Sequence, residues 1–383
     1  MRWDYVTNFV QLISENIYEY SVSADGRLVA LMHSQNIVAN GVELFELALL
    51  DFDTKQITTI IEGSPRLYAI SLSPDGEWIA YYPNLNGGRL YAVRTNGSNQ
   101  TIELGFCHQV LDTPCSPITW SPDSRELLWS DQRGVWHTRL DWESPQVVTT
   151  NNIQVIDPHG EMSQIMVTFD SLFWSPQGRF ALGVITPSTS TTRWYAVLDT
   201  RRKRLIEIPE SFQPGTSTIN VIWLEDGKLM VADGRGGSTV TLKFWEVIPT
   251  QNDLLSLTKS YDIVSNDLPT PIDNHVSEWS YLVDWPYQIN HRQVGFGVKI
   301  IGENTLPILF NLDLKNNVLI LVDQVPSYSE IVLWSPDGQG ALIIGRGQEL
   351  FFSPMDGGML LDLNPILGDE AENFYWLPPT PRS

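Results

Sequence analysis

The chain has 383 residues, 42% of them hydrophobic, and its 14 tryptophans are ample for a large buried core. The formal net charge of −21 argues against a nucleic-acid-binding protein, because phosphate backbones are bound by clustered Lys and Arg side chains. No apolar run reaches the roughly 18 residues that a membrane-spanning helix needs, so no membrane span is expected.

The first residues of the chain, Met1–Tyr5, lack the basic start and the apolar stretch of a secretion signal. Either the protein is cytoplasmic or a leader is missing from this chain. Residues 3–13 are expected to form two short strands ahead of the first turn motif.

From residue 20 onward, a short apolar strand runs repeatedly into a tight turn, as in Leu72–Gly76. In the Ser-Pro-Asp-Gly form of this turn, Pro fixes its own φ, Asp bonds the backbone and Gly supplies a positive φ. A tryptophan stands at the same position before most of the turns. This Trp column consists of Val22, Leu72, Trp120, Trp174, Trp223, Trp285, Trp334 and Trp376. Repeats of about 50 residues in an all-strand pattern are typical of β-propeller blades.

Length alone would favour more than one domain, but the repeat accounts for the whole chain. It predicts one all-β domain over 1–383, a β-propeller of seven four-stranded blades. The blades are expected to start near residues 20, 70, 118, 172, 221, 283 and 332. Terminal strands at 3–13 and 374–378 would close the ring by pairing in one blade. The alternative is eight blades, the last split between the two termini.

The Trp column has two interpretations. A flat blade cannot bury both faces alone, so the column is expected to fill the wedges between neighbouring blades. The other interpretation is a stack of ligand-binding rings that face the central channel. We favour the packing interpretation, because nothing in the sequence places the column in the channel.

The turn motifs at Trp120–Ser124, Trp174–Gly178 and Trp334–Gly338, each followed by an apolar strand, resemble those of TolB-like (WD-repeat-like) bacterial β-propellers. The resemblance covers nearly the whole chain, although Trp285–Tyr287 lacks the Asp-Gly turn. It implies the propeller fold and leaves the activity open, since such propellers serve as scaffolds, periplasmic adaptors, enzyme domains and peptidase lids.

The chain contains 2 cysteines, Cys107 and Cys115, in the stretch that joins the second and third repeats. They either form a loop disulfide, which would indicate an oxidising compartment, or remain two thiols. The expected location is extracytoplasmic if the disulfide forms and a leader is missing, and cytoplasmic otherwise.

Catalytic motifs are missing from the sequence. It contains no Gly-x-Ser-x-Gly elbow, no Gly-Lys-Ser/Thr phosphate loop and no His-Glu-x-x-His pair, and its 6 histidines are scattered over different repeats. We therefore expect no catalytic residue, no cofactor and no metal site. Calcium at Asp51–Asp53, Asn311–Asp313 or Asp356–Gly358 is a weaker alternative, because hairpin turns need the same residue types. The basic cluster Arg201–Arg204 is expected to be a solvated hairpin tip.

The longest intervals in the Trp column run from Trp223 to Trp285 and from Trp120 to Trp174. Loops on a rigid propeller are where binding residues are usually mounted, although insertions without a function are also tolerated. The candidate interaction residues in these insertions are Asp157, His159, Glu161, Asn266, Asp267, Asp273 and Asn274.

The leading hypothesis for function is a non-enzymatic protein-interaction scaffold or complex subunit with an unidentified protein partner. It rests on a chain that is nearly all repeat and lacks a catalytic motif. The first alternative is an extracytoplasmic small-ligand-binding or lyase- or hydrolase-type propeller with a site in the central channel. The second alternative is a surface or filament component, which the acidity and aromatic richness favour weakly.

Overall fold

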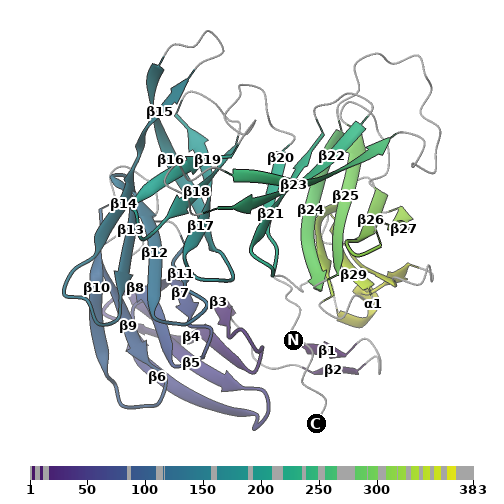
Figure 1. The fold of residues 1–383 in the computed structure, drawn as a ribbon. Helices are drawn as coiled ribbons and strands as arrows, with labels where there is room; N and C mark the ends of the chain where they lie inside the picture. Colours follow the sequence, from purple (N-terminus) through teal and green to yellow (C-terminus); the bar gives the residue numbers. More distant parts are fainter. Residues whose placement is uncertain are drawn as a thin grey trace. The chain divides into compact units, whose positions relative to one another are not determined.

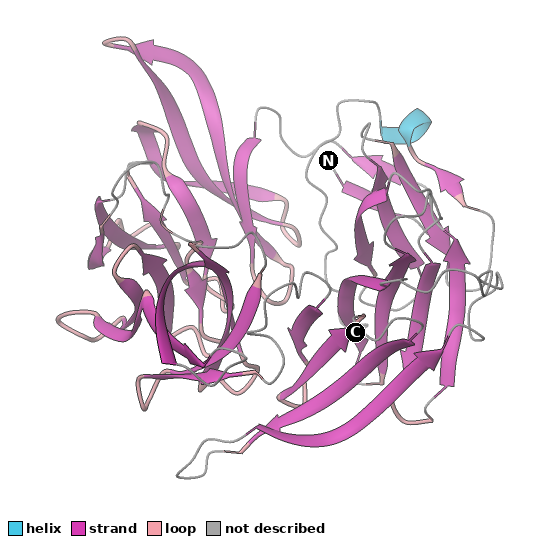
Figure 2. Cartoon of the chain, turned by 90° about the horizontal axis from the view of Figure 1, so that it is seen from above, coloured by secondary structure: helices cyan, strands magenta, loops and turns pink. Residues whose placement is uncertain are grey.

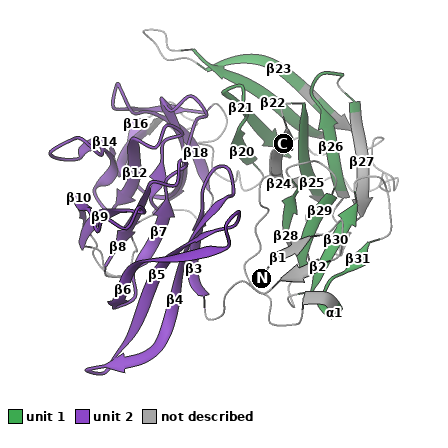
Figure 3. Cartoon of the chain, turned by 90° about the horizontal axis from the view of Figure 1, so that it is seen from below, with its two compact units in different colours: residues 1–13, 216–379 green, residues 14–215, 380–383 purple. Residues whose placement is uncertain are grey.

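The computed structural model describes most of the chain. The described residues are 2–4, 9–11, 17–83, 88–108, 115, 117–156, 162–188, 193–208, 219–234, 239–248, 255–264, 281–290, 292–300, 308–316, 318–324, 329–335, 340–345, 349–354 and 360–367. Within these residues the regular secondary structure is strand, except for the short helix α1 (Asn364–Leu367) (Figure 2). The chain divides into two compact units, one of residues 14–215 and 380–383 and the other of residues 1–13 and 216–379 (Figure 3).

The unit of residues 14–215 contains four antiparallel sheets that follow one another along the chain (Figure 1). The first sheet consists of β3 (Ile17–Val22), β4 (Leu28–Ala39), β5 (Val42–Asp51) and β6 (Gln56–Ser64). The second consists of β7 (Tyr68–Leu72), β8 (Trp78–Tyr82), β9 (Gly88–Arg94) and β10 (Thr101–Cys107). The third consists of β11 (Thr119–Trp120), β12 (Glu126–Asp131), β13 (Gly134–Arg139) and β14 (Gln146–Thr150). The fourth consists of β15 (Asn152–Ile156), β16 (Met162–Trp174), β17 (Phe180–Pro187), β18 (Trp194–Asp199) and β19 (Arg204–Glu207).

The unit of residues 216–379 repeats the same four-stranded pattern. Its first sheet consists of β20 (Ile219–Trp223), β21 (Lys228–Asp233), β22 (Thr239–Val247) and β23 (Leu255–Val264). Its second consists of β24 (Tyr281–Asn290), β25 (Gln293–Ile300), β26 (Ile308–Asp313) and β27 (Val318–Gln324). Its third consists of β28 (Ser329–Trp334), β29 (Gly340–Gly345), β30 (Leu350–Pro354) and β31 (Leu361–Asp362). Strands β1 (Arg2–Asp4) and β2 (Phe9–Gln11) pair with each other in a separate two-stranded sheet.

The serine of the turn motif ties the turn to the strand that follows it. Ser73 Oγ donates to Asp75 Oδ1 at 2.6 Å and accepts the N–H of Trp78 at 3.0 Å. Gly76 has a φ of 74°, the left-handed conformation that such a turn requires. Ser23 and Ser121 make the same pair of bonds in the neighbouring sheets. The recurring residues therefore fix where each first strand ends and each second strand begins.

The second strand of a sheet is buried on both faces. All five residues of β8 are buried, and so are Leu127 to Asp131 of β12. A strand that is covered on both sides has a continuous apolar run instead of alternation, which is the sequence pattern of these segments. Successive four-stranded meanders with doubly covered inner strands are the blade arrangement of a propeller.

The strand count differs from the prediction of seven or eight four-stranded blades. Among the described residues, six sheets have four strands, one has five and one has two. The five-stranded sheet gains β15, which the sequence did not indicate. The segment 374–378, expected to close the ring, lies outside the described residues, while β1 pairs with β2. The number of blades and the closure of the ring stay predictions.

Candidate interaction site

Two tryptophans of the Trp column hydrogen-bond the sheet that precedes their own. Trp120 Nε1 donates to the carbonyl of Ser71 at 2.9 Å, and Trp174 Nε1 donates to the carbonyl of Thr119 at 3.1 Å. Both indoles are buried, with exposed fractions of 6% for Trp120 and 8% for Trp174. The packing interpretation is confirmed at these two positions, because the rings fill the junctions between sheets and are closed to a ligand.

A third member of the column shows the same packing in the other unit. Trp334 is 2% exposed and lies against Gly295 of β25, in the preceding sheet. A Cβ added at Gly295 would lie 2.5 Å from the indole. The glycine is therefore required by the close approach of the ring to the backbone.

The predicted interaction residues all lie outside the described part of the chain. They belong to the segments 157–161 and 265–280. The first segment has a described stem, because β15 pairs with residues 162–166 of β16 in antiparallel register. Asn152 lies opposite Met166, and Ile156 lies opposite Met162. We name these two strand segments, 152–156 and 162–166, the β15–β16 ribbon (Figure 1).

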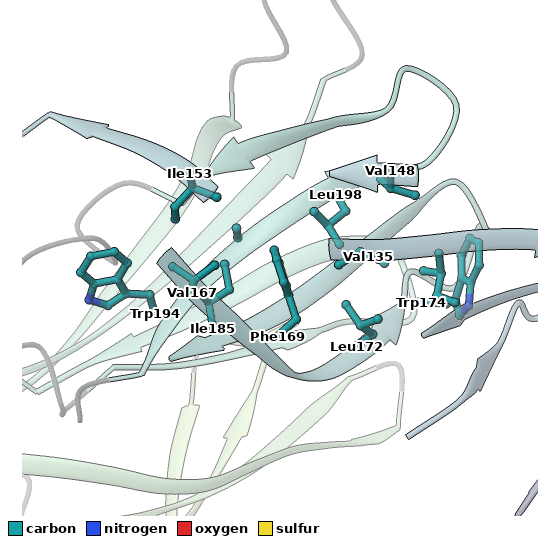
Figure 4. Close-up of a cluster of buried hydrophobic side chains, with 13 residues drawn as sticks. Val135, Val148, Ile153, Val167, Phe169, Leu172, Trp174, Ile185, Trp194 and Leu198 are labelled. Atoms are coloured by element: carbon teal, nitrogen blue, oxygen red, sulfur yellow. The ribbon is translucent and has the colours of Figure 1, made fainter. Parts of the chain in front are cut away.

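The β15–β16 ribbon is anchored at its base and exposed along one face. Ile153 is 5% exposed and belongs to the buried cluster that contains Val167 and Trp194 (Figure 4). On the opposite face, Met162 and Met166 are 68% and 60% exposed. Strands β15 and β16 therefore flank the predicted loop, and Met162 and Met166 of β16 expose apolar side chains to solvent.

The cysteine pair lies beside a buried carboxylate. Cys107 and Cys115 lie next to each other with their Cα atoms 6.3 Å apart, a spacing within the usual range for a disulfide. His108, which follows Cys107 in the sequence, donates its backbone N–H to Asp131 Oδ2 at 3.0 Å. Asp131 also accepts from Trp136 Nε1 at 2.9 Å, so the backbone of His108 is fixed to the third sheet. The oxidation state of the pair in the cell stays a prediction.

Sequence reasoning missed one polar cluster, on β12 and β13. His137 Nε2 lies 2.9 Å from Glu126 Oε2, and Arg139 Nη1 lies 3.8 Å from the other oxygen of Glu126. The imidazole contacts the rings of Trp142 and Trp174 edge-on at centroid distances of 5.0 and 5.9 Å. Pairing the two expected strands across a short turn at residues 132–133 would have brought Glu126 and His137 to one face.

A shallow hollow of about 260 Å³ adjoins this cluster. It is lined by Arg125, Arg139, Leu140 and Asp141. The side chain of His137 is 6% exposed, so its ring has little access to a substrate in the hollow. The arrangement fits a brace between strands and neighbouring rings better than a proton-transfer site, which needs an imidazole nitrogen within reach of the reactant.

The acidic turns considered for calcium are occupied by backbone amides. Asp51 Oδ1 accepts the N–H of Asp53 at 2.8 Å, and Asp313 Oδ1 accepts the N–H of Asn316 at 3.0 Å. The bond from Asn316 is also the main cause that lowers the pKa of Asp313. Among the described His, Cys, Asp and Glu residues, no group of three is arranged to hold a metal ion. Residues 356–358 lie outside the described chain.

The basic cluster forms the turn between β18 and β19, as predicted. Arg201 and Arg202 each donate a backbone N–H to Asp199 Oδ1 at 3.1 Å, and the residues of the turn are exposed. The cluster is therefore a capped hairpin tip in solvent. No helix in the described chain is long and apolar enough to cross a membrane.

No protein-family model matches the sequence, and no curated protein matches it. The fold is shared with solved structures. Dipeptidyl peptidase 4 from Porphyromonas gingivalis matches with a TM-score of 0.56 at 9% identity, over 92% of this chain and 53% of that one. A prolyl endopeptidase matches with a TM-score of 0.53 at 12% identity, over 90% and 49%. A eukaryotic initiation factor matches with a TM-score of 0.51 at 13% identity, over 92% and 79%.

These similarities, with the successive antiparallel sheets, confirm the predicted fold class, an all-β β-propeller. The chain spans about half the length of the two peptidases. Peptidases and an initiation factor share the fold, so the fold does not decide between enzyme and scaffold.

Proposed function

We propose that this chain is a non-enzymatic protein-interaction scaffold or complex subunit built on a TolB-like propeller. The observation that carries the proposal is the β15–β16 ribbon, which departs from the four-stranded repeat and holds two exposed methionines, Met162 and Met166. Methionine is enriched at protein interfaces, and its flexible thioether adapts to the surface of a partner.

The position of the predicted loop supports the same proposal. Asp157, His159 and Glu161 lie between β15 and β16 along the sequence. The ribbon on either side of them is held at its base by the buried side chain of Ile153. Rigid scaffolds that carry exposed loops are a frequent form of binding protein.

Affinity purification of the tagged full chain from its native host, with quantitative mass spectrometry, tests the proposal. A stoichiometric protein partner is expected with the wild type and should be lost with the double variant Met162→Ser/Met166→Ser. The matched control is Ile57→Ser, which changes a side chain that is 53% exposed on β6. A clean monomer with the wild type would contradict the scaffold.

The second candidate function is a small-ligand-binding propeller, and the hollow beside Glu126 and His137 favours it. Arg125 offers a guanidinium group there, while Arg139 and Asp141 lie 3.2 Å apart as an ion pair on the wall of the hollow. Thermal-shift screening of small polar compounds would detect such a ligand, and Arg125→Gln should remove the shift. A screen without any shift would count against this candidate.

A further inference from the structure

The β15–β16 ribbon has an open outer edge. In the described chain β15 pairs with β16 alone, so the N–H and C=O groups on its other side have no strand partner. The pairing of β17 with β16 begins at Val167, opposite Pro187. One further backbone bond, from the N–H of Ser188 to the carbonyl of Met166 at 2.9 Å, lies beyond this pair.

This edge also lacks the features that usually protect an exposed strand. Exposed edges are commonly guarded by lysines, prolines or β-bulges. Residues 152–156 and 162–166 contain no charged residue and no proline, although 18% of the chain is charged. The register from Asn152–Met166 to Ile156–Met162 continues without a bulge.

The hairpin tip of β4 and β5 shows the contrast. It also extends beyond its neighbouring strands, and Val38 there is 68% exposed. Its register shifts between Ser34 and Ile37, Asn36 has a φ of 55°, and Glu43 adds a charge. A bulge and a charge are the protective features that the β15–β16 ribbon lacks.

We infer that the outer edge of β15 is a docking site for an extended segment of a partner protein, which adds to the ribbon as a further strand. Backbone hydrogen bonds to residues 152–156 would give the affinity, as in other cases of β-strand addition. The net charge of −21 favours a partner segment that is uncharged in its centre and basic at its flanks. The inference rests on the scaffold function and names the kind of partner.

A second copy of this chain is the less suitable occupant. Pairing two identical edges would bring together two molecules with a net charge of −21 each, and like charges oppose association. Asp157 and Glu161, next to the ribbon in the sequence, would add like charges close to the contact.

The test uses the full chain and a defined probe, a fluorescein-labelled peptide of alternating Val and Thr flanked by lysines. Neighbouring N–H groups on a strand point to opposite edges. The N–H of Val167 donates to the carbonyl of Asn151, so with this register the N–H of Val155 faces β16 and that of Gln154 faces outward. Val155→Pro therefore breaks the pairing with β16, whereas Gln154→Pro removes an outward N–H and leaves that pairing intact. Gln154→Pro should bind the probe about tenfold more weakly, as judged by fluorescence polarisation. Val38→Pro, in the β4–β5 tip, is the matched control and should bind like the wild type.

Hydrogen exchange locates the probe independently of the variants. Amides within residues 152–156 should gain protection when the probe binds to the wild type. Absence of binding, protection elsewhere, or an equal loss in Val38→Pro would overturn the inference. Self-association of the wild type that Gln154→Pro abolishes would also overturn it, because the edge would then hold a second copy.

The purification experiment distinguishes a failure of this inference from a failure of the proposed scaffold function. A partner that still purifies with both β15 proline variants would leave the scaffold standing and remove the β15 edge as its docking site. A wild type that purifies without any partner would contradict the scaffold itself.

Discussion

Trp174 combines two contributions to stability in one side chain. Its ring fills the junction between the third and fourth sheets, and its N–H satisfies the carbonyl of Thr119. Burial of the ring and the hydrogen bond can be separated, because phenylalanine keeps most of the apolar area and lacks the donor.

Trp174→Phe should lower the free energy of unfolding by about 1–2 kcal/mol, and Trp174→Ala by roughly 3–5 kcal/mol. Urea denaturation followed by circular dichroism measures both values. Equal losses in the two variants would mean that the hydrogen bond to Thr119 dominates and that burial of the ring adds little.

Glu19 joins β3 to β7 through a partly desolvated carboxylate. Its Oε1 accepts the N–H of Ile70 at 2.8 Å, and burial is the main cause that raises the pKa of this carboxyl. A raised pKa means that the folded state binds this proton more tightly than the unfolded state. The contribution to stability is therefore present below the ordinary glutamate pKa of about 4.3 and is lost as pH rises through the higher folded value.

Glu19→Gln removes this titration and keeps an oxygen acceptor for the Ile70 N–H. Relative to the wild type, the variant should gain free energy of unfolding as the pH rises above about 4.3, and the difference should level off above the folded pKa. Denaturation across pH 4 to 8 checks this, with Glu62→Gln on the exposed surface of β6 as the control. A difference between Glu19→Gln and the wild type that does not change with pH would contradict the assignment.

At the scale of the element, Gly295 shows how a strand of one sheet receives the ring of the next. Gly295→Ala would force its new Cβ against the indole of Trp334, and overpacking of this kind costs about 1–3 kcal/mol. The loss should be recovered in the double variant Gly295→Ala/Trp334→Phe, which a double-mutant cycle measures. Additive effects would mean that the two residues are not in contact.

A disulfide between Cys107 and Cys115 would be a covalent link between the second and third sheets. Free-thiol labelling and mass spectrometry of unreduced protein should find Cys107 and Cys115 blocked. The double variant Cys107→Ser/Cys115→Ser should lose about 2–3 kcal/mol of stability, the value for a short closed loop. Two labelled thiols in protein from the native host would contradict both the disulfide and an oxidising compartment.

The sequence predicted elements well where local chemistry decides them, and missed them where it does not. Ser73 and Asp75 carry their turn geometry in their own side chains, so the ends of β7 and β8 could be found without the structure. Strand β15 could not be found from the sequence, because Asn152–Ile156 becomes a strand only by pairing with Met162–Met166. Glu126 and His137 likewise meet only through the register of β12 with β13.

For the whole molecule, the repeat was sufficient for the fold class because most of the repeats share the same turn and carry a tryptophan at the same position. The candidate interaction site could not be predicted from the repeat, since it lies where the repeat is interrupted. The sequence located one break, between Trp120 and Trp174, and the structure showed that part of it is a strand. The predicted interaction residues of that break, such as His159, lie outside the described residues.

The net charge of −21 acts on the whole molecule by self-repulsion, which favours the expanded state. Raising the ionic strength from about 0.01 M to about 0.1 M shortens the Debye length from roughly 30 Å to roughly 10 Å. The melting temperature should rise over this range, as differential scanning calorimetry would show, and sodium and potassium chloride should act alike. A fall in the melting temperature would mean that attractive ion pairs outweigh the repulsion.

The direction of the tryptophan hydrogen bonds bears on how the chain is made. Trp120 donates to Ser71, and Trp174 donates to Thr119, so in both cases the donor is synthesised after its acceptor. A sheet that leaves the ribosome therefore finds its acceptor in a sheet that has already emerged, and the N-terminal part of a chain generally folds first during synthesis. At these two junctions, the sheet that is finished first can therefore serve as the template for the ring of the sheet that follows.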